Sequence, residues 1–530
     1  MEERPREKAG SPQLTRRRFL KAGASAAVLG AAAATAAGCG PTRSSSSKPA
    51  TTKPRRGGTL RVAMTGGGAS DTLDGQQGVD PPDNARSLSL YDPLIAQDAK
   101  GKPLLALAES IESNSTATIW TINLRKGVTW HNGKPLTPAD IIYSYRRIVA
   151  NKLGGAEILA PCDVSSMRQV GQNTIQLPCH VPYPTFIEAS ASFQVYLNIL
   201  PTGYDVHHPV GTGPFMYRSF TPGQTSAFVR NPNYWRSPYP YVDQLIIYDF
   251  ADEASELDAL ASNQVDCVGG VSAISIPSAR SQGARILISE TGAFTPLTMR
   301  IDRPPLNDVR VRQALRLCVN RPEMRELVFG GHGLLGNDLV SPFDPVYDHS
   351  LPQRHQDIDQ AKALLKQAGQ DGMTLTLQAS PIAPGTTQMT TVFAQQASAA
   401  GIKVNLDSIP TSTFFGPSYL QWPFAEDLWL NSYYIVQVAE AFLPTSPYNE
   451  THFNSPEYTR LYNEASTTVN PGRRVELCHE MQKIDYTEGG YIIPYFLPVI
   501  DLYAQRVHGA TTSVAGGSFG DYAFAEMWLD

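Results

Sequence analysis

Segments with the pattern of strands and segments with the pattern of helices alternate through most of this 530-residue chain. Residues 358–368 place their apolar side chains on one helical face, with Asp357 and Gln360 spaced as a capping box and Gly369 as a stop. Residues 373–377 then alternate as a strand. This alternation is typical of α/β lobes that contain mixed or largely parallel sheets.

The same order recurs elsewhere in the chain. Residues 386–400 are predicted as a helix and 402–406 as the next strand, and residues 244–271 give a strand, a helix and a strand. No repeat of fixed period is present, which disfavours a solenoid or a propeller. A chain of this length exceeds one ordinary domain, so we expect two lobes.

The first 39 residues have the features of an export signal. Arg16 and Arg17 lie in a twin-arginine pattern, and residues 22–37 are almost wholly small and apolar. That run is too short to span a membrane, which takes roughly 20 apolar residues. It ends at Cys39 in a sequence that resembles a lipoprotein processing box. The alternative is an ordinary cleaved signal followed by an incidental cysteine.

Residues 39–58 are rich in Ser, Thr, Pro and Lys and are predicted to be a flexible tether. Removing residues 1–38, which hold seven Lys and Arg and three Glu, changes the net charge from −5 to −9. A mildly acidic chain without a long basic run is not expected to bind nucleic acid. We expect an extracytoplasmic body anchored by its lipid to the outer face of the cytoplasmic membrane.

The remaining cysteines show no Cys-x-x-Cys spacing that would indicate zinc or redox chemistry. Cys162 and Cys179 flank a segment whose centre, residues 171–173, resembles a hairpin turn. An oxidising compartment allows a disulfide between them. The alternative is that all five cysteines after Cys39 are buried free thiols.

Several blocks resemble the oligopeptide and dipeptide class (family 5) of solute-binding proteins of ABC importers, in the order of that family. The most specific runs from Trp120 to Arg146 and reads WTINLRKGVTWHNGKPLTPADIIYSYR. The others are GGTLRV (57–62), YDPL (91–94), GTGPF (211–215), NPNYW (231–235), NDVRVRQAL (307–315) and YIIPY (491–495).

The resemblance implies an α/β, bilobal, periplasmic-binding-protein-like fold in its large three-part version, with a ligand cleft between the lobes. The implied division is a signal at 1–38, a tether at 39–58, a first lobe at 59–292 plus 497–530 with an inserted subdomain at 89–195, and a second lobe at 293–496. The implied function is capture of oligopeptides or dipeptides and their delivery to an ABC permease with its ATPase subunits. Such a protein is a monomer without a cofactor or a bound metal, and it is not an enzyme.

In peptide-binding relatives, an aspartate shortly after a Trp holds the free amino end of the peptide. The segment here that resembles this motif begins at Trp429, and Ser432 replaces the aspartate. A hydroxyl can accept a hydrogen bond from an ammonium group but cannot neutralise its charge. The charge must be balanced by Glu426, Asp427 or Glu440, or else the ligand lacks a free amino terminus.

The candidate ligand contacts are Trp429, Asn431, Ser432, Tyr433 and Glu440 from the second lobe, with Asp74 and Gln77 from the first. The alternative for Trp429 and Tyr433 is that they belong to the core of the lobe. Ligands other than peptides stay open, among them oligosaccharides and chelates of nickel or another metal.

One short motif suggests an enzyme instead. Residues 516–520 fit the Gly-x-Ser-x-Gly pattern of serine hydrolases, with Ser518 as the nucleophile. That site also needs an acid and a histidine later in the chain, and no histidine follows. We therefore expect these glycines to form a surface loop.

Overall fold

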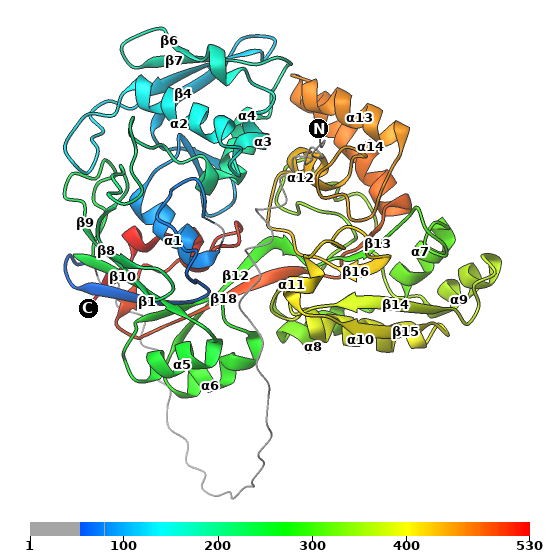
Figure 1. Ribbon diagram of the computed structural model, residues 1–530. Coiled ribbons are helices and arrows are strands. Elements are labelled where there is room, and N and C mark those ends of the chain that lie inside the picture. Colours follow the sequence, from blue (N-terminus) through cyan, green and yellow to red (C-terminus); the bar gives the residue numbers. More distant parts are fainter. Residues whose placement is uncertain (1–52, 79) are drawn as a thin grey trace, which may run out of the picture.

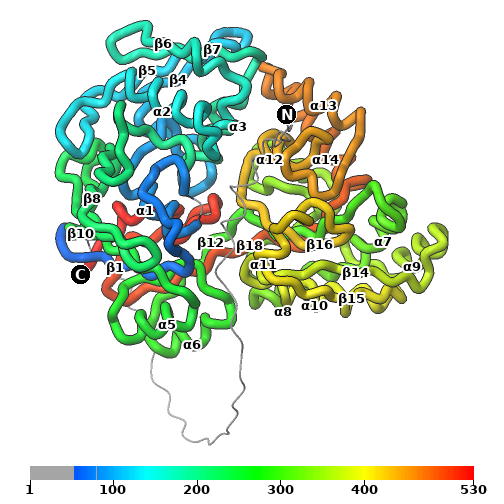
Figure 2. The backbone as a smooth tube through the Cα atoms, in the orientation of Figure 1, coloured from blue at the N-terminus to red at the C-terminus, as the bar shows by residue number. Residues whose placement is uncertain are grey.

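The computed structural model describes residues 53–78 and 80–530, which form two lobes joined by two long strands (Figure 1). The joining strands, β12 (Arg285–Phe294) and β18 (Phe496–Tyr503), pair antiparallel over most of their length. Figure 2 shows the backbone entering the second lobe after β12 and returning through β18 near the C-terminus. The chain therefore crosses between the lobes along these two paired strands.

The first lobe contains a seven-stranded mixed sheet. Its order is β12, β18, β11 (Cys267–Gly269), β1 (Thr59–Thr65), β10 (Gln244–Phe250), β9 (Thr225–Arg230) and β8 (Phe215–Thr221). β1 pairs in parallel with β10 and β11, and the other pairs are antiparallel. This agrees with the mixed sheet that the alternating pattern predicts.

Successive side chains of β1 pack into two different hydrophobic cores, one on each face of the sheet. Leu60 and Val62 pack with α1 (Pro81–Leu90) on one face. Ala63 packs on the other face, which α5 (Glu253–Ala261) and α6 (Ile276–Ser281) cover. Successive strand residues point to opposite faces, so a sheet covered by helices on both sides needs apolar residues at consecutive positions.

An additional part of the first lobe has its own core. Its four-stranded sheet has the order β4 (Ala108–Ser113), β5 (Ile119–Leu124), β7 (Thr174–Pro178) and β6 (Arg168–Gln169). Around it lie the hairpin β2 (Ile95–Gln97) and β3 (Pro103–Leu105), and the helices α2 (Pro138–Ala150), α3 (Ala156–Leu159) and α4 (Phe186–Ser192). Cys162 and Cys179 form a disulfide here, and Cys267, Cys318 and Cys478 are buried free thiols.

The carboxylate of Asp92 joins three of the blocks that carry the family resemblance. It accepts hydrogen bonds from the Thr212 hydroxyl at 2.9 Å, the Tyr234 hydroxyl at 3.1 Å and the Trp235 indole N–H at 2.9 Å. Gly211 lies so close to the end of α1 that an added Cβ would be 1.8 Å from the carbonyl oxygen of Leu90. These three blocks therefore belong to the scaffold of the first lobe.

The second lobe contains a five-stranded sheet in the order β15 (Lys403–Ser408), β14 (Thr374–Ala379), β16 (Phe424–Glu426), β13 (Leu297–Met299) and β17 (Tyr491–Ile492). Its helices are α7 (Val309–Leu317), α8 (Arg321–Phe329), α9 (Ile358–Gln367), α10 (Thr386–Ser398), α11 (Thr411–Phe414), α12 (Tyr434–Ala441), α13 (Pro456–Thr467) and α14 (Pro471–Glu488). The Asp357 side chain caps α9, as the sequence predicts, by accepting from the Gln360 backbone N–H at 2.8 Å.

The expectation of a surface loop at residues 516–520 is wrong. Ser518 is only 6 % exposed, and the Phe519 ring is fully buried in the core of the first lobe. These residues belong to α15 (Ser518–Tyr522), where Phe519 and Asp521 have left-handed backbone angles. A buried aromatic side chain stabilises this turn, and no sequence pattern indicated it.

Candidate functional site

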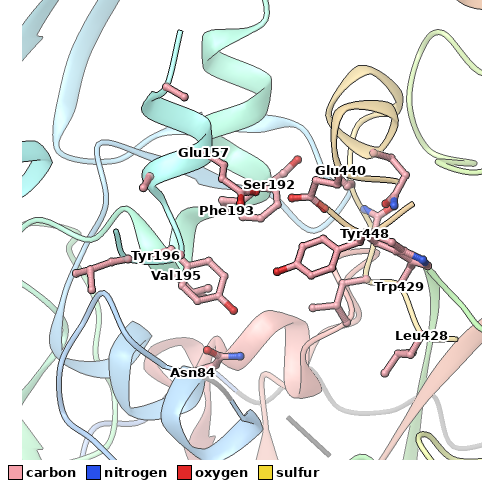
Figure 3. Close-up of a pocket in the computed structure, with 18 of the residues that line it drawn as sticks. Asn84, Glu157, Ser192, Phe193, Val195, Tyr196, Leu428, Trp429, Glu440 and Tyr448 are labelled. Carbon is pink, nitrogen blue, oxygen red and sulfur yellow. The ribbon is translucent and has the colours of Figure 1, made fainter. Parts of the chain in front are cut away.

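A cavity of about 420 Å³ lies between the two lobes. One wall is formed by α1, by α3 with the residues just before it, and by the end of α4 with the short 3₁₀ helix η2 (Gln194–Tyr196). The facing wall comes from the segment after β16 and from α12 with the loop that follows it. Figure 3 shows side chains from both walls pointing into the same space. The volume is within the range of pockets that enclose small ligands, about 300–1,000 Å³.

Aromatic side chains contribute much of the lining, namely Phe193, Tyr196, Phe415, Trp429 and Tyr448. The Trp429 indole N–H donates to Oε1 of Glu450 at 3.0 Å, and its backbone pairs with Phe294 of β12. Tyr448 packs edge-on against the Trp429 ring at 6.2 Å between centroids. Trp429 is thus held rigidly between the crossing strand and the cavity.

Three residues that line the cavity each carry a buried polar atom with no hydrogen-bond partner among the described residues, namely Asn84 Oδ1, Ser192 Oγ and Gln437 Nε2. Asn84 is 8 % exposed and Gln437 only 1 %. Buried polar groups are nearly always paired, because leaving one unpaired costs about 1–3 kcal/mol. Their common position at one cavity indicates partners that enter it.

Acidic side chains predominate over basic ones in the lining. Glu157, Asp427 and Glu440 carry carboxylates, and Lys152 is the single cationic residue among the described residues that line the cavity. The Glu157 side chain is solvent-exposed, yet partial desolvation raises its pKa. Burial raises the pKa of Tyr196 to about 12, and the charge of Glu440 on the facing wall adds to that shift.

Four of the residues predicted to contact a ligand line this cavity: Trp429, Asn431, Ser432 and Glu440. Asp74 and Gln77 lie outside its lining. Asp74 forms an ion pair with Arg147 and accepts from the Gln77 side chain at 2.8 Å. Its buried carboxylate is therefore engaged within the first lobe.

Tyr433 also lies outside the lining, and it has a different contact. Its hydroxyl donates to the carbonyl oxygen of Gly101, between β2 and β3, at 2.8 Å. Its ring packs on the core of the additional part of the first lobe. A second contact between the lobes joins Arg474 of α14 to Glu188 of α4, with 4.0 Å between the charged atoms. Both contacts join the two lobes outside the lining of the cavity.

Glu426 and Asp427, the other acids considered for charge balance, have different positions. Glu426 is buried at the end of β16, within the sheet, and accepts from the Ser380 backbone N–H at 2.5 Å. Asp427 lines the cavity and accepts from the Tyr419 hydroxyl at 2.9 Å. Glu440 and Asp427 are therefore the two of these acids that reach the cavity.

Sequence reasoning missed the wall supplied by the first lobe. Asn84, Glu157, Ser192 and Tyr196 lie on short helices between scaffold blocks, without a motif. Gln437, one turn before Glu440 on α12, was also missed. Helical spacing from Glu440 could have indicated Gln437, because residues three apart share a helix face.

Some predicted features lie outside the described residues. These are the export pattern with Arg16 and Arg17, and the proposed lipid acceptor Cys39. In residues 53–78 and 80–530, no helix combines the length and the apolar character needed to cross a membrane.

The chain resembles known proteins in sequence. The model of the bacterial extracellular solute-binding proteins, family 5 (Middle), matches residues 102–434. The dipeptide-binding protein of Escherichia coli K12 is 26 % identical over 330 residues, which cover 56 % of this chain and 61 % of that protein. The nickel-binding periplasmic protein of the same organism is 23 % identical over 293 residues, 53 % of this chain and 56 % of that protein. This chain thus matches less than two thirds of each of these two relatives.

The fold has close counterparts among solved structures. The ABC transporter substrate-binding protein CtaP of Listeria monocytogenes superposes with a TM-score of 0.80 at 18 % identity, covering 90 % of this chain and 100 % of that one. This confirms the α/β periplasmic-binding-protein fold. Because the family match covers well over half of the sequence, the chain belongs to the bacterial extracellular solute-binding proteins of family 5.

Proposed function

We propose that this chain is the extracytoplasmic substrate-binding subunit of an ABC importer. It captures a small solute in the cavity between its lobes and delivers it to a membrane permease driven by ATPase subunits. The observation that carries the proposal is the aromatic cavity with three buried polar atoms that have no partner among the described residues. Such a site offers apolar contact area and a few directed hydrogen bonds, the usual composition of a small-molecule site.

The connection between the lobes suits capture by closure. β12 and β18 are the strands that cross between them, so a change of backbone angles near their ends would rotate one lobe against the other. The Tyr433–Gly101 hydrogen bond and the Arg474–Glu188 pair can form only when the two lobes are close together. A ligand that contacts both walls favours the closed state, because it gains contacts there that the open state lacks.

Oligopeptides and dipeptides are the solutes suggested by the family resemblance and by the name of the dipeptide-binding relative. The cavity volume suits a ligand of about dipeptide size. Ser432 lines the cavity where an aspartate would be expected, so an ammonium group would have to pair with Glu440 or Asp427. A metal chelate is the alternative solute, because one relative is named as a nickel-binding protein. Oligosaccharides are a further alternative.

Calorimetry with the mature chain tests solute capture. A library of di- to pentapeptides, oligosaccharides and metal chelates should yield a ligand that binds one per chain. Ser192→Trp fills the cavity and should abolish this binding, whereas Ser115→Trp, on an exposed turn of the same part of the first lobe, should leave it unchanged. Thermal melting without ligand checks that both variants fold. Undiminished affinity in Ser192→Trp, or no ligand in any class, contradicts the proposal.

The proposal includes membrane anchoring through Cys39 and export through Arg16 and Arg17, which the sequence alone supports. Cys39→Ser should release the protein from membranes in cell fractionation. Replacing both arginines by lysine should leave uncleaved precursor in the cytoplasm. A Cys39→Ser protein that still sediments with membranes rules out the lipid anchor.

A further inference from the structure

The charged residues that line the cavity indicate which class of solute it binds. This inference rests on the proposed function, in which the chain binds its solute in this cavity. Three acidic residues line the cavity, and one of them, Asp427, accepts from the Tyr419 hydroxyl and from the Leu428 backbone N–H at 2.7 Å. Glu157 and Glu440 come from facing walls, on α3 and α12, and lie at the same end of the cavity in Figure 3. Two carboxylates facing one partly desolvated space repel each other unless a positive charge lies between them.

Little in the lining can balance a negative charge on a ligand. No arginine is among the described residues that line the cavity, and Lys152 is the one basic residue, with an exposed side chain. A free carboxylate, such as the C-terminal end of a peptide, would be desolvated there beside acidic groups. Burying an uncompensated charge costs several kcal/mol, so the cavity disfavours ligands with an anionic end.

The neutral part of the lining also suits a cation. The rings of Tyr196, Trp429 and Tyr448 lie near these acids and can contact a cation through their faces or pack on an apolar body. The unpartnered Nε2 of Gln437 can only donate, so it requires an acceptor on the ligand. The unpartnered Oδ1 of Asn84 can only accept, so it requires a donor.

We infer that the cavity selects a small organic cation, with an ammonium or guanidinium group between Glu157 and Glu440 and an uncharged opposite end. The body of the ligand is apolar or aromatic and carries at least one carbonyl-type acceptor and one N–H or O–H donor. A zwitterionic peptide meets only part of this description, because its carboxylate has no cationic partner other than Lys152.

Charge-matched probes test the inference by calorimetry. The first set is phenylalanyl-alanine as the free zwitterion, the C-terminal amide, the N-acetyl acid and the doubly blocked form. The second set is phenethylamine, phenylacetamide and phenylacetate. The cation of each set should bind at least tenfold more tightly than the anion, and the dipeptide amide more tightly than the zwitterion.

Neutral variants assign the preference to the two acids. In Glu157→Gln with Glu440→Gln, the tenfold preference for the cation should disappear, while Glu112→Gln, an exposed position on β4, should keep it. Melting curves without ligand show whether the double variant is folded. If the double variant does not fold, the preference for the cation is measured in each single variant instead. A preference unchanged by every one of these variants overturns the assignment.

The outcomes separate this inference from the proposed function. Anionic or neutral probes that bind as well as the cations overturn the inference alone. If no probe binds, the ligand found in the wider solute library decides: a net cation supports the inference, and a neutral or anionic ligand overturns it. No binding by any probe or library member overturns the proposed function and the inference together.

Discussion

Asp92 determines how three separate chain segments pack. Its buried carboxylate holds Thr212, Tyr234 and Trp235, and burial raises its pKa while these hydrogen bonds oppose the shift. Asp92→Ala leaves one buried donor, on Thr212, and two partly buried donors, on Tyr234 and Trp235, without an acceptor. We therefore expect a loss of about 3 kcal/mol in the free energy of unfolding. Urea denaturation measures this, with the exposed Asp371→Ala as control. Equal stability of the two variants would show that the network is dispensable.

Glu426 makes the stability of the second lobe depend on pH. Burial raises its pKa from 4.5 to about 8, opposed by the Ser380 N–H bond and increased by the charge of Asp427. Between about pH 4.5 and 8 the folded chain keeps a proton that the unfolded chain has released, so this group's stabilisation is lost as the pH rises.

Glu426→Gln should therefore match the natural chain in stability near pH 5 and exceed it by a few kcal/mol near pH 8.5. Urea denaturation across this range measures the difference. Other carboxyl groups also have a raised pKa, such as Glu256 with a pKa of about 8. Their effect on stability is the same in both proteins and cancels in the comparison. Identical pH slopes for the natural chain and the variant would mean that Glu426 does not cause the effect.

At the scale of elements, the segment from β16 to α12 both lines the cavity and joins the lobes. Trp429, Asn431 and Ser432 face the cavity, and the Tyr433 hydroxyl reaches Gly101 of the first lobe. Tyr433→Phe removes a hydrogen bond that forms only when the two lobes are close together. One such bond stabilises the closed state by about 0.5–1.5 kcal/mol.

The expected result for Tyr433→Phe is a ligand affinity about two- to tenfold lower, with the melting temperature of the free protein little changed. Calorimetry measures the affinity, and Tyr217→Phe, at a half-exposed site on β8, is the matched control. An affinity equal to that of the control would exclude Tyr433 from closure.

The elements were predictable from the sequence where the signal is local. The cap of α9 and the strand β14 both agree with the predicted pattern. The wall supplied by Glu157, Ser192 and Tyr196 was not predictable. These residues come close to the second lobe only because the two lobes pack together. Neither the spacing of residues in the sequence nor its hydrophobic periodicity predicts that packing. Trp429 to Ser432 were found through family resemblance.

At the scale of the whole molecule, one chain forms two lobes with their own cores and a cavity between them. The boundaries near residues 292/293 and 496/497 stay a prediction, although β12 and β18 cross between the lobes in this region. Both lobes are needed to form the cavity. The first lobe supplies Glu157 and Tyr196 to its lining, and the second supplies Trp429 and Glu440. Recognition of a solute is therefore coupled to the relative position of the lobes.

A crystal structure of the chain with the tightest-binding solute from calorimetry tests this coupling most directly. We expect one ligand between Tyr196 of the first lobe and Trp429 of the second, with hydrogen bonds to Asn84 Oδ1 and Gln437 Nε2. The Tyr433–Gly101 contact should be formed in the same structure. A ligand bound outside this cavity, or held by one lobe while the other stands apart, would contradict it.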